Sequence, residues 1–228
     1  MKEVEKLHHL GHRQRLRKRF SDSPSSLAEY ELLELLLFYV FSRKDTKPLS
    51  KKLLDRSDGS LRKLILMDLS DLQNVEGIGK SSLLLLALLR EIFNRTLLEQ
   101  IRESCSIMSI GQVLDYYKNM MEQLKKEQFR LMFLSNTNGL IAEELMHEGT
   151  VNSTAIYPRE IIQKALNHGA SAIILVHNHP GGNPRPSRRD LIMTRAVRDV
   201  AQRLEISLLD HLIIGKNSHY SMREAGII

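Results

Sequence analysis

The sequence predicts an α/β (α+β) protein in which a small all-helical domain, residues 1–103, precedes a mixed domain, residues 104–228. Leucines repeat at helical spacing through the first hundred residues, and no β-branched run occurs there. After that point, short apolar runs bounded by turn residues alternate with amphipathic helical stretches. Apolar residues make up 42% of the chain and charged residues 26%, a balance that is typical of folded globular domains.

The elements of the first part follow from spacing and from helix-breaking residues. A helix is expected over residues 27–41, after a stop and cap at Pro24 to Ser26. A break over residues 42–48 leads to a helix near residues 49–54, and a turn follows at residues 58–60. Short helices then bracket a turn over residues 74–79, and a long helix is expected over residues 80–102.

The second part contains four predicted strands and two predicted helices. The run from Ser171 to His177 is almost wholly apolar, which indicates a strand buried on both faces. The other predicted strands span residues 129–134, 139–146 and 208–215, and the helices span residues 159–168 and 187–203.

Positive charge is concentrated near the N-terminus. The formal net charge is +6, and residues 1–63 contain 15 Lys and Arg against nine Asp and Glu. The densest basic run lies between Arg13 and Arg19. Such a run is either a solvated helix face or a contact for nucleic acid, and the sequence does not decide between them.

Several protein classes are excluded by composition. A single cysteine, Cys105, leaves no disulfide framework and no Cys-rich metal site within one chain. The longest apolar runs, residues 35–41 and 83–89, are far shorter than the ~20 residues that span a bilayer. The first residues carry acids and lack the apolar core of a secretory signal, so a cytoplasmic protein is expected.

The most informative stretch runs from His177 to Asp190. In an extended chain side chains alternate, so His177 and His179 point to one side and Asn178 points away. Asp190 follows in the first turn of the next predicted helix, where Ser187 is the expected N-cap. Two histidines and a carboxylate leave one open position on a tetrahedral Zn²⁺, as in catalytic zinc sites.

Part of this stretch has a purely structural explanation. Ser187 followed three residues later by Asp190 before an apolar helix is also a capping box, which by itself accounts for both residues. The two histidines taken alone could also be core or turn residues. The combination of two histidines at period two, a Pro-Gly strand end and the Ser/Asp pair favours the metal.

The pattern His-x-His-Pro, with a serine and an aspartate at these spacings, resembles the signature of JAMM (MPN-type) zinc metalloproteases. Residues 148–150, 157–160, 177–180 and 210–215 are more specifically similar to RadC, the bacterial branch of that fold, as are residues 11–16 and 31–36. The resemblance implies a mixed sheet flanked by helices and one Zn²⁺ per chain. It further implies that His177, His179 and Asp190 bind the ion and that a water molecule completes the site.

The resemblance also implies a glutamate that accepts a proton from this water at the start of the first long strand, where Glu127 stands. Glu143, Glu144 and Glu148 are alternatives, and each of the four could be only an exposed strand-edge charge. Ser187 is the candidate to stabilise the oxyanion, a role that would compete with capping for one hydroxyl. His211 either orients a ligand or is a buried strand histidine with a local hydrogen bond.

Residues 72–80 resemble a helix-hairpin-helix, in which Gly77 and Gly79 permit a tight turn and Lys80 opens the next helix. Backbone N–H groups at that helix start suit a DNA phosphate, although the hairpin could equally serve only to pack helices. Lys47, Lys51, Lys52, Arg13 and Arg17 could add positive charge if they share its face.

The leading hypothesis is therefore a zinc-dependent metallopeptidase or isopeptidase that acts on an unidentified protein or peptide and is joined to a helical module that contacts DNA. The alternative is a DNA-binding adaptor in repair or recombination, whose metal site is structural or vestigial. The sequence leaves the oligomeric state open.

Overall fold

The computed structural model describes residues 2–103, 110–149 and 156–228. Contacts divide the chain into two compact units, residues 1–92 and 93–228. Cys105, the one cysteine, lies outside the described residues. Within the described ranges no helix is long and apolar enough to cross a membrane, and the cytoplasmic location stays a prediction.

The first unit is built from helices around a leucine core. Its elements are α1 (Lys2–Asp22), a 3₁₀ turn (Pro24–Ser26), α2 (Glu29–Leu37), α3 (Lys47–Arg56), α4 (Leu61–Leu66), α5 (Leu69–Gln73) and the start of α6 (Lys80–Glu103). The core consists of side chains that helical spacing brings to one face of each helix: Leu33, Leu37, Leu49, Leu53, Leu64, Leu72 and Leu86.

Helix α2 is shorter than the sequence predicts at both ends. Ala28 has extended backbone angles, and its N–H donates to the Glu31 carboxylate at 3.0 Å, which fixes the start of the helix. Beyond Leu37 the chain turns, and the buried Arg13 guanidinium donates to the carbonyls of Phe41, Ser42 and Lys44. These bonds hold the chain in an irregular path.

The second unit contains one mixed sheet of five strands among its described residues. The strands are β1 (Glu127–Leu134), β2 (Leu140–Gly149), β3 (Ala172–Asn178), β4 (Ser207–Gly215) and β5 (Ser218–Ser221), in the order β2-β1-β3-β4-β5. Strands β3 and β4 are parallel and the other neighbours are antiparallel. All seven residues of β3 are buried, as its apolar sequence predicts.

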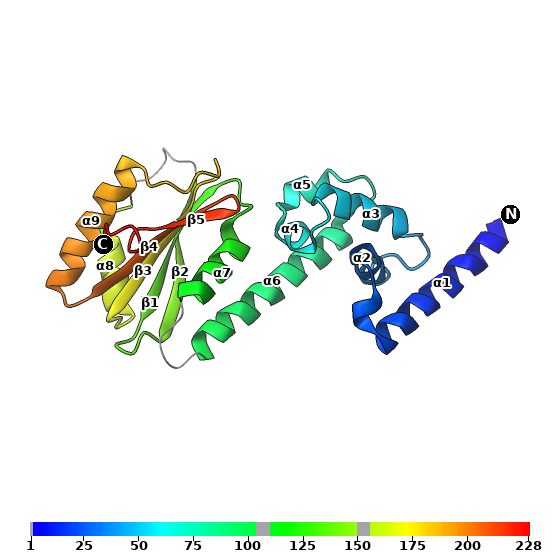
Figure 1. Ribbon diagram of the computed structural model, residues 1–228, viewed down its shortest axis with the longest axis horizontal. Helices are drawn as coiled ribbons and strands as arrows, with labels where there is room; N and C mark the ends of the chain where they lie inside the picture. The colour runs from blue at the N-terminus through cyan, green and yellow to red at the C-terminus, as the bar shows by residue number, and fades with distance from the viewer. Residues whose placement is uncertain (1, 104–109, 150–155) are drawn as a thin grey trace. The chain divides into compact units, whose positions relative to one another are not determined.

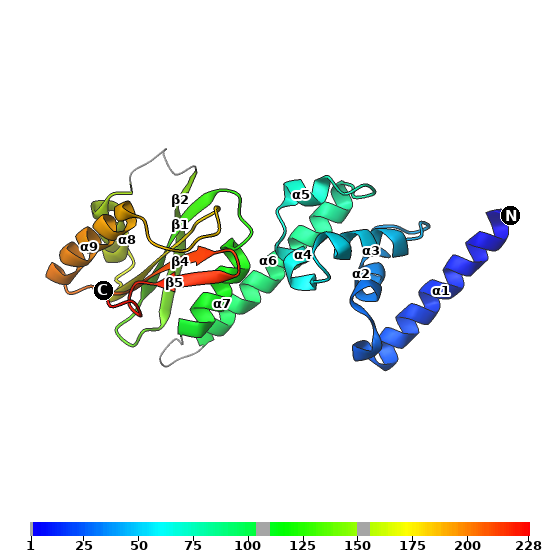
Figure 2. The same ribbon diagram turned by 45° about the horizontal axis from the view of Figure 1, so that its top comes forward.

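Helices cover both faces of this sheet (Figure 1). Helix α7 (Ile110–Met121) packs on one face together with Leu97, Leu98 and Ile101 of α6. Helices α8 (Pro158–Asn167) and α9 (Arg188–Arg203) pack on the other face, as the turned view in Figure 2 also shows. The α/β class is thus confirmed, with a helical layer on either side of a mixed sheet.

Two details differ from the sequence-based expectations. The sequence places the domain boundary between residues 103 and 104, whereas the compact units meet at residues 92 and 93, inside α6. The reason is that the second half of α6 buries its apolar face in the core of the second unit. Helix α7 and strand β5 are further elements that the sequence did not predict.

The topology brings two chain segments together at one end of the sheet. Strands β1 and β3 are antiparallel and Phe129 lies opposite His177, so the beginning of β1 lies beside the end of β3. A loop leads from β3 to α9, whose first turn therefore lies near the same end. Glu127, His177, His179 and Asp190 all belong to these segments.

Candidate metal centre

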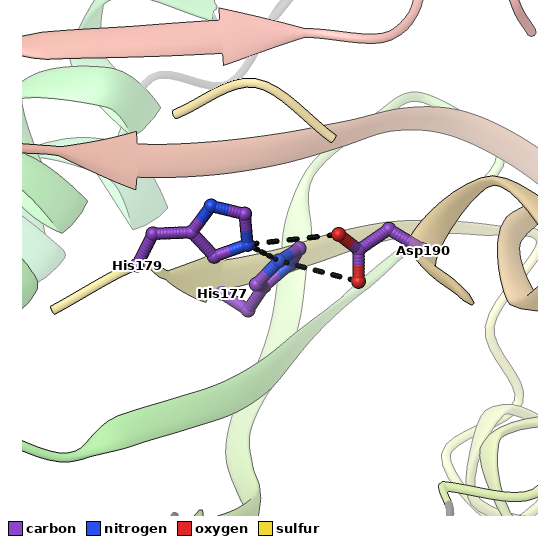
Figure 3. Close-up of side chains that lie close together, drawn as sticks. All are labelled: His177, His179 and Asp190. Atoms are coloured by element: carbon purple, nitrogen blue, oxygen red, sulfur yellow. Dashed lines mark hydrogen bonds and ion pairs between the residues drawn. The ribbon is translucent and has the colours of Figure 1, made fainter. Parts of the chain in front are cut away.

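His177, His179 and Asp190 converge on one point at this end of the sheet (Figure 3). The Nε2 atoms of the two histidines are 2.9 Å apart. Oδ1 of Asp190 is 3.6 Å from Nε2 of His177, and Oδ2 is 3.6 Å from Nε2 of His179. Three potential ligand residues thus surround a common position.

These distances fit one small metal ion. Two atoms bound to a tetrahedral zinc at 2.0–2.1 Å are about 3.4 Å apart, which lies between the separations found here. Two imidazole nitrogens and one carboxylate are also a donor set that Zn²⁺ accepts. The residues present therefore fit the metal that the sequence motif implies.

His177 is held by a chain of hydrogen bonds that also fixes its tautomer. The Thr194 hydroxyl donates to the Asp190 carbonyl at 2.6 Å, so it can only accept from Nδ1 of His211, 2.5 Å away. Nε2 of His211 then accepts from Nδ1 of His177, at 2.8 Å. Nε2 of His177 consequently presents a lone pair to the metal position.

This assignment requires a neutral His211. Burial lowers the pKa of the completely buried His211 ring well below its ordinary value, and the nearby His177 lowers it further. The ring therefore carries one proton, which agrees with its donating through Nδ1 and accepting through Nε2.

His179 is held by the loop that follows β3. Its Nδ1 lies 2.8 Å from the carbonyl oxygen of Asn183, which can only accept, so Nε2 is again left for a ligand. The backbone of the loop is bound to the end of β4: His179 N–H donates to Ile214 O, and Lys216 N–H donates to Gly182 O. The loop thereby fixes the second imidazole against the sheet.

Asp190 is placed by the start of helix α9. Its Oδ2 accepts from the Ser187 N–H at 2.7 Å, while the Ser187 hydroxyl accepts from the Asp190 N–H at 3.2 Å. This is the capping box that the sequence offered as an alternative explanation. Capping and convergence on the histidines are therefore compatible, because the cap is what directs the carboxylate toward the imidazoles.

The electrostatics of the three residues favour a cation between them. Burial would raise the pKa of the Asp190 carboxyl, but its interactions with His177 and His179 outweigh that effect and lower the pKa strongly. Asp190 in turn raises the pKa of His179 against the opposing effect of burial. In the metal-free protein a proton therefore competes for the position that a metal ion would take.

A cavity of about 410 Å³ lies directly against this site. Polar side chains of Glu127, His179, Ser187 and Asp190 line it together with an apolar wall. The wall includes the side chains of Phe129, Ile156 and Met193. A substrate group in this cavity would contact the metal position, a carboxylate and a hydroxyl at once.

Glu127 is distinguished from the three alternative glutamates by its surroundings. It lines the cavity, and its negative charge helps to raise the pKa of His179. Glu143 instead binds Arg130 at 2.6 Å, and Glu144 binds Lys164 and His168. Glu148 accepts from the Gln128 side chain at 2.8 Å.

Comparison with known protein families agrees with this arrangement. The sequence model of the RadC-like JAB domain matches residues 107–227, which is more than half of the chain. The chain belongs to the RadC-like JAB domain family. The matched range contains the five-strand mixed sheet and the three residues that could hold a metal ion, and the match indicates a fold of the JAMM/MPN family.

Ser187 in the RadC-like domain is less restricted than the sequence suggested. The cap uses an acceptor lone pair of its hydroxyl, whereas stabilising an oxyanion would use the hydroxyl hydrogen. The two roles therefore do not compete, which corrects the expectation from sequence. Ser187 also lines the cavity beside Asp190.

Three residues support the triad of the RadC-like domain. The sequence predicts such a role for His211 only as one of two alternatives, and it predicts none for Thr194 or Asn183. The structure places His211 directly against His177. The sequence could have indicated Thr194 as a neighbour of Asp190, because it lies four residues later and so on the same face of α9.

The predicted hairpin lies in the first unit, outside the RadC-like match. Gly77 has φ of +98°, which favours glycine, but Gly79 has an ordinary φ and open space where a Cβ would stand. Only Gly77 is therefore required by the turn, which corrects the expectation for Gly79. Lys80 begins α6 and is exposed.

The predicted basic residues divide into paired and exposed groups. Arg13 is buried against backbone carbonyls and is not a surface cation, so the condition under which it could add charge to the hairpin face is not met. Lys52 pairs with Glu76 at 2.7 Å. Lys47 and Lys51 both lie over the Tyr30 ring, and both are exposed.

Proposed function

We propose that the RadC-like domain hydrolyses an amide bond as a zinc-dependent metallopeptidase or isopeptidase. The observation that carries this proposal is that Glu127 lines the same cavity as His179 and Asp190, two members of a candidate two-histidine, one-aspartate ligand set. A ligand set alone would equally suit a structural metal. A carboxylate and a hydroxyl in an adjoining cavity supply what hydrolysis needs in addition.

In this proposal His177, His179 and Asp190 hold one Zn²⁺ and leave one position open. When bound, the metal would supply Lewis acidity, which makes a water molecule easier to deprotonate near neutral pH. Glu127 would accept the proton of the attacking water and deliver it to the leaving amine, because an amine is expelled readily only when protonated. Glu127 therefore acts first as a base and then as an acid.

Ser187 is the proposed donor to the oxyanion of the tetrahedral intermediate. Its hydroxyl lines the cavity, and the capping bond holds the Oγ atom without using its hydrogen. Pre-positioned donors of this kind typically contribute about 10²–10³ in turnover. The substrate is a protein or peptide whose scissile carbonyl can enter the cavity.

The test is a cleavage assay with a peptide library and the zinc-loaded full-length protein. We expect mass spectrometry to detect products with the wild-type protein and none with Glu127→Gln, although both bind one zinc per chain. Glu148→Gln is the matched control, since Glu148 lies outside the cavity lining. Turnover by Glu127→Gln would assign the proton transfer to another group, and no products from the wild-type protein would reject the hydrolase.

A second candidate function is supported by the first unit. We propose that it binds DNA through the hairpin at Gly77, Gly79 and Lys80. The Lys44 amine would lie 3.6 Å from a Cβ placed on Gly77, so an exposed cation stands beside the hairpin turn. The first N–H groups of α6, which have no partner within the helix, complete a surface suited to a phosphate.

Salt dependence tests the DNA proposal. Binding of the full-length protein to a fluorescent duplex should weaken steeply with salt, and Lys80→Ala should reduce the slope of log affinity against log salt by roughly one, because one phosphate is no longer neutralised. Lys63→Ala is the control, because Lys63 pairs with Asp58 at 2.9 Å on a different turn. Binding that ignores salt, or is absent, would contradict the proposal and the adaptor role that depends on it.

A further inference from the structure

Asn178 lies between the two metal-ligating histidines and makes a pair of hydrogen bonds that the site described above does not use. It is the last residue of β3 and is only 2% exposed. Its Oδ1 accepts from the Gln128 N–H at 2.8 Å, and its Nδ2 donates to the Lys126 carbonyl at 3.1 Å. One buried side chain thus binds two backbone groups of another segment.

The two groups that Asn178 binds lie on either side of Glu127. The Lys126 carbonyl belongs to the peptide unit before Glu127, and the Gln128 N–H belongs to the peptide unit after it. Holding both peptide units restricts φ and ψ of Glu127, which are the angles that direct its Cα–Cβ bond. The direction in which the Glu127 side chain leaves the strand is therefore set by Asn178.

The carboxamide extends the sheet beyond its last backbone pair. Pairing between β1 and β3 runs from Leu134 opposite Ala172 to Phe129 opposite His177. Past this point the Asn178 side chain supplies the acceptor and the donor that a further strand residue would supply from its backbone. Asparagine suits this position because one planar group carries both functions, whereas an ionised aspartate has no donor.

We propose that Asn178 is a positioning residue that fixes Glu127 relative to the metal, so that residues 177–179 set both the ligands and the proton acceptor. This inference rests on the proposed hydrolase, because the position of Glu127 matters only if Glu127 transfers the proton. In this segment His177 and His179 face the metal position, and Asn178 between them binds the backbone on either side of Glu127. The distance between the base and the ion then depends on three consecutive residues.

The test compares Asn178→Asp with the wild-type protein, both loaded with Co²⁺. The variant keeps an acceptor for Gln128 but places a carboxylate oxygen against the Lys126 carbonyl. We expect one cobalt per chain in both proteins, because the ligands are unchanged. Repulsion between that carboxylate oxygen and the Lys126 carbonyl should push the two segments apart and so weaken the bond from Gln128 as well. Hydrogen exchange at the Gln128 amide should therefore accelerate on the order of tenfold, and paramagnetic relaxation of the Glu127 carboxyl carbon should weaken as it moves from the ion.

Turnover provides the second measurement. The control is Asn119→Asp, which makes the same change at a buried asparagine on α7. In the cleavage assay Asn178→Asp should lower kcat on the order of 10²-fold with KM unchanged. Asn178→Ser should lower kcat by less than Asn178→Asp. Unchanged exchange and relaxation would overturn the proposal, as would loss of cobalt in step with turnover. A wild-type protein without turnover would reject the hydrolase alone, because exchange and relaxation still report the position of Glu127.

Discussion

Nδ1 of His177 lies 2.8 Å from Nε2 of His211, and the His211 ring is completely buried. Because Thr194 joins His211 to the backbone carbonyl of Asp190, two of the three candidate ligand residues are connected by hydrogen bonds that do not involve a metal. The ligand set is therefore organised by the protein, and its supporting residues should matter almost as much as the ligands.

Thr194→Val tests this support. Valine keeps the shape of threonine but cannot accept from His211, so the tautomer of His177 is no longer fixed. We expect zinc affinity to fall by roughly 10–100-fold in competition with a chromophoric chelator. Thr46→Val, at a buried threonine in the first unit, should leave affinity unchanged, and equal affinity in both variants would remove Thr194 from the support.

His177→Ala removes a ligand outright. The purified variant should contain far less than the one zinc per chain that we expect for the wild-type protein, as measured by elemental analysis. His219→Ala is the control, since His219 lies on β5 and is not part of the convergent triad. Full zinc retention in His177→Ala would contradict the assignment of the metal centre.

Glu144 is expected to stabilise the fold rather than to take part in catalysis. Hydrogen bonds from Lys164 and then His168 lower its pKa below the ordinary 4.5. Such a carboxylate contributes stability above its unfolded pKa and loses it as the pH falls through the lower folded pKa. In urea unfolding, Glu144→Gln should cost about 1 kcal/mol at pH 7 and nothing at a pH below both pKa values.

An equal cost at both pH values would mean that packing, and not charge, explains the effect of Glu144→Gln. Peptide cleavage by this variant should match the wild-type rate, because Glu144 is bound to Lys164 and His168 and does not line the cavity. A loss of turnover in a variant with normal stability would return Glu144 to the candidates for proton transfer.

Gly215→Ala tests how tightly the loop that carries His179 is fitted to β4. A Cβ on Gly215 would overlap the Gly182 carbonyl oxygen and lie 2.9 Å from Pro184, so the loop must move. We expect a destabilisation of about 3 kcal/mol in thermal unfolding, together with weaker zinc binding. Gly181→Ala is the matched control, because a Cβ there meets nothing within 4 Å. Similar stability of both variants would contradict the close fit.

The sequence was most informative where local spacing decides geometry. Period two in a buried strand places His177 and His179 on one side, and capping places Asp190 at a helix start. The bonds of Asn178 to residues 126 and 128 could not be predicted, because they join segments about fifty positions apart. Strand β5 is short and polar, and it forms only because β4 offers it a partner.

Helix α7 was missed for a different reason. Its inward face includes Tyr116 and Tyr117, whose intrinsic preference is for strands, although Val113, Tyr117 and Met121 recur at the spacing of a helix face. Only the cavity separates Glu127 from the other three glutamates proposed as general base, because Glu127 alone of the four lines it. Long-range packing, and not local pattern, carried that information.

The capping box at Ser187 and Asp190 has a consequence for how the ion is acquired. The cap directs the Asp190 carboxylate toward the imidazoles without the help of a metal ion, so binding of an ion need not order this side chain. A site that is arranged in advance imposes its own geometry on the ion, so geometry and intracellular supply together decide which divalent ion is bound.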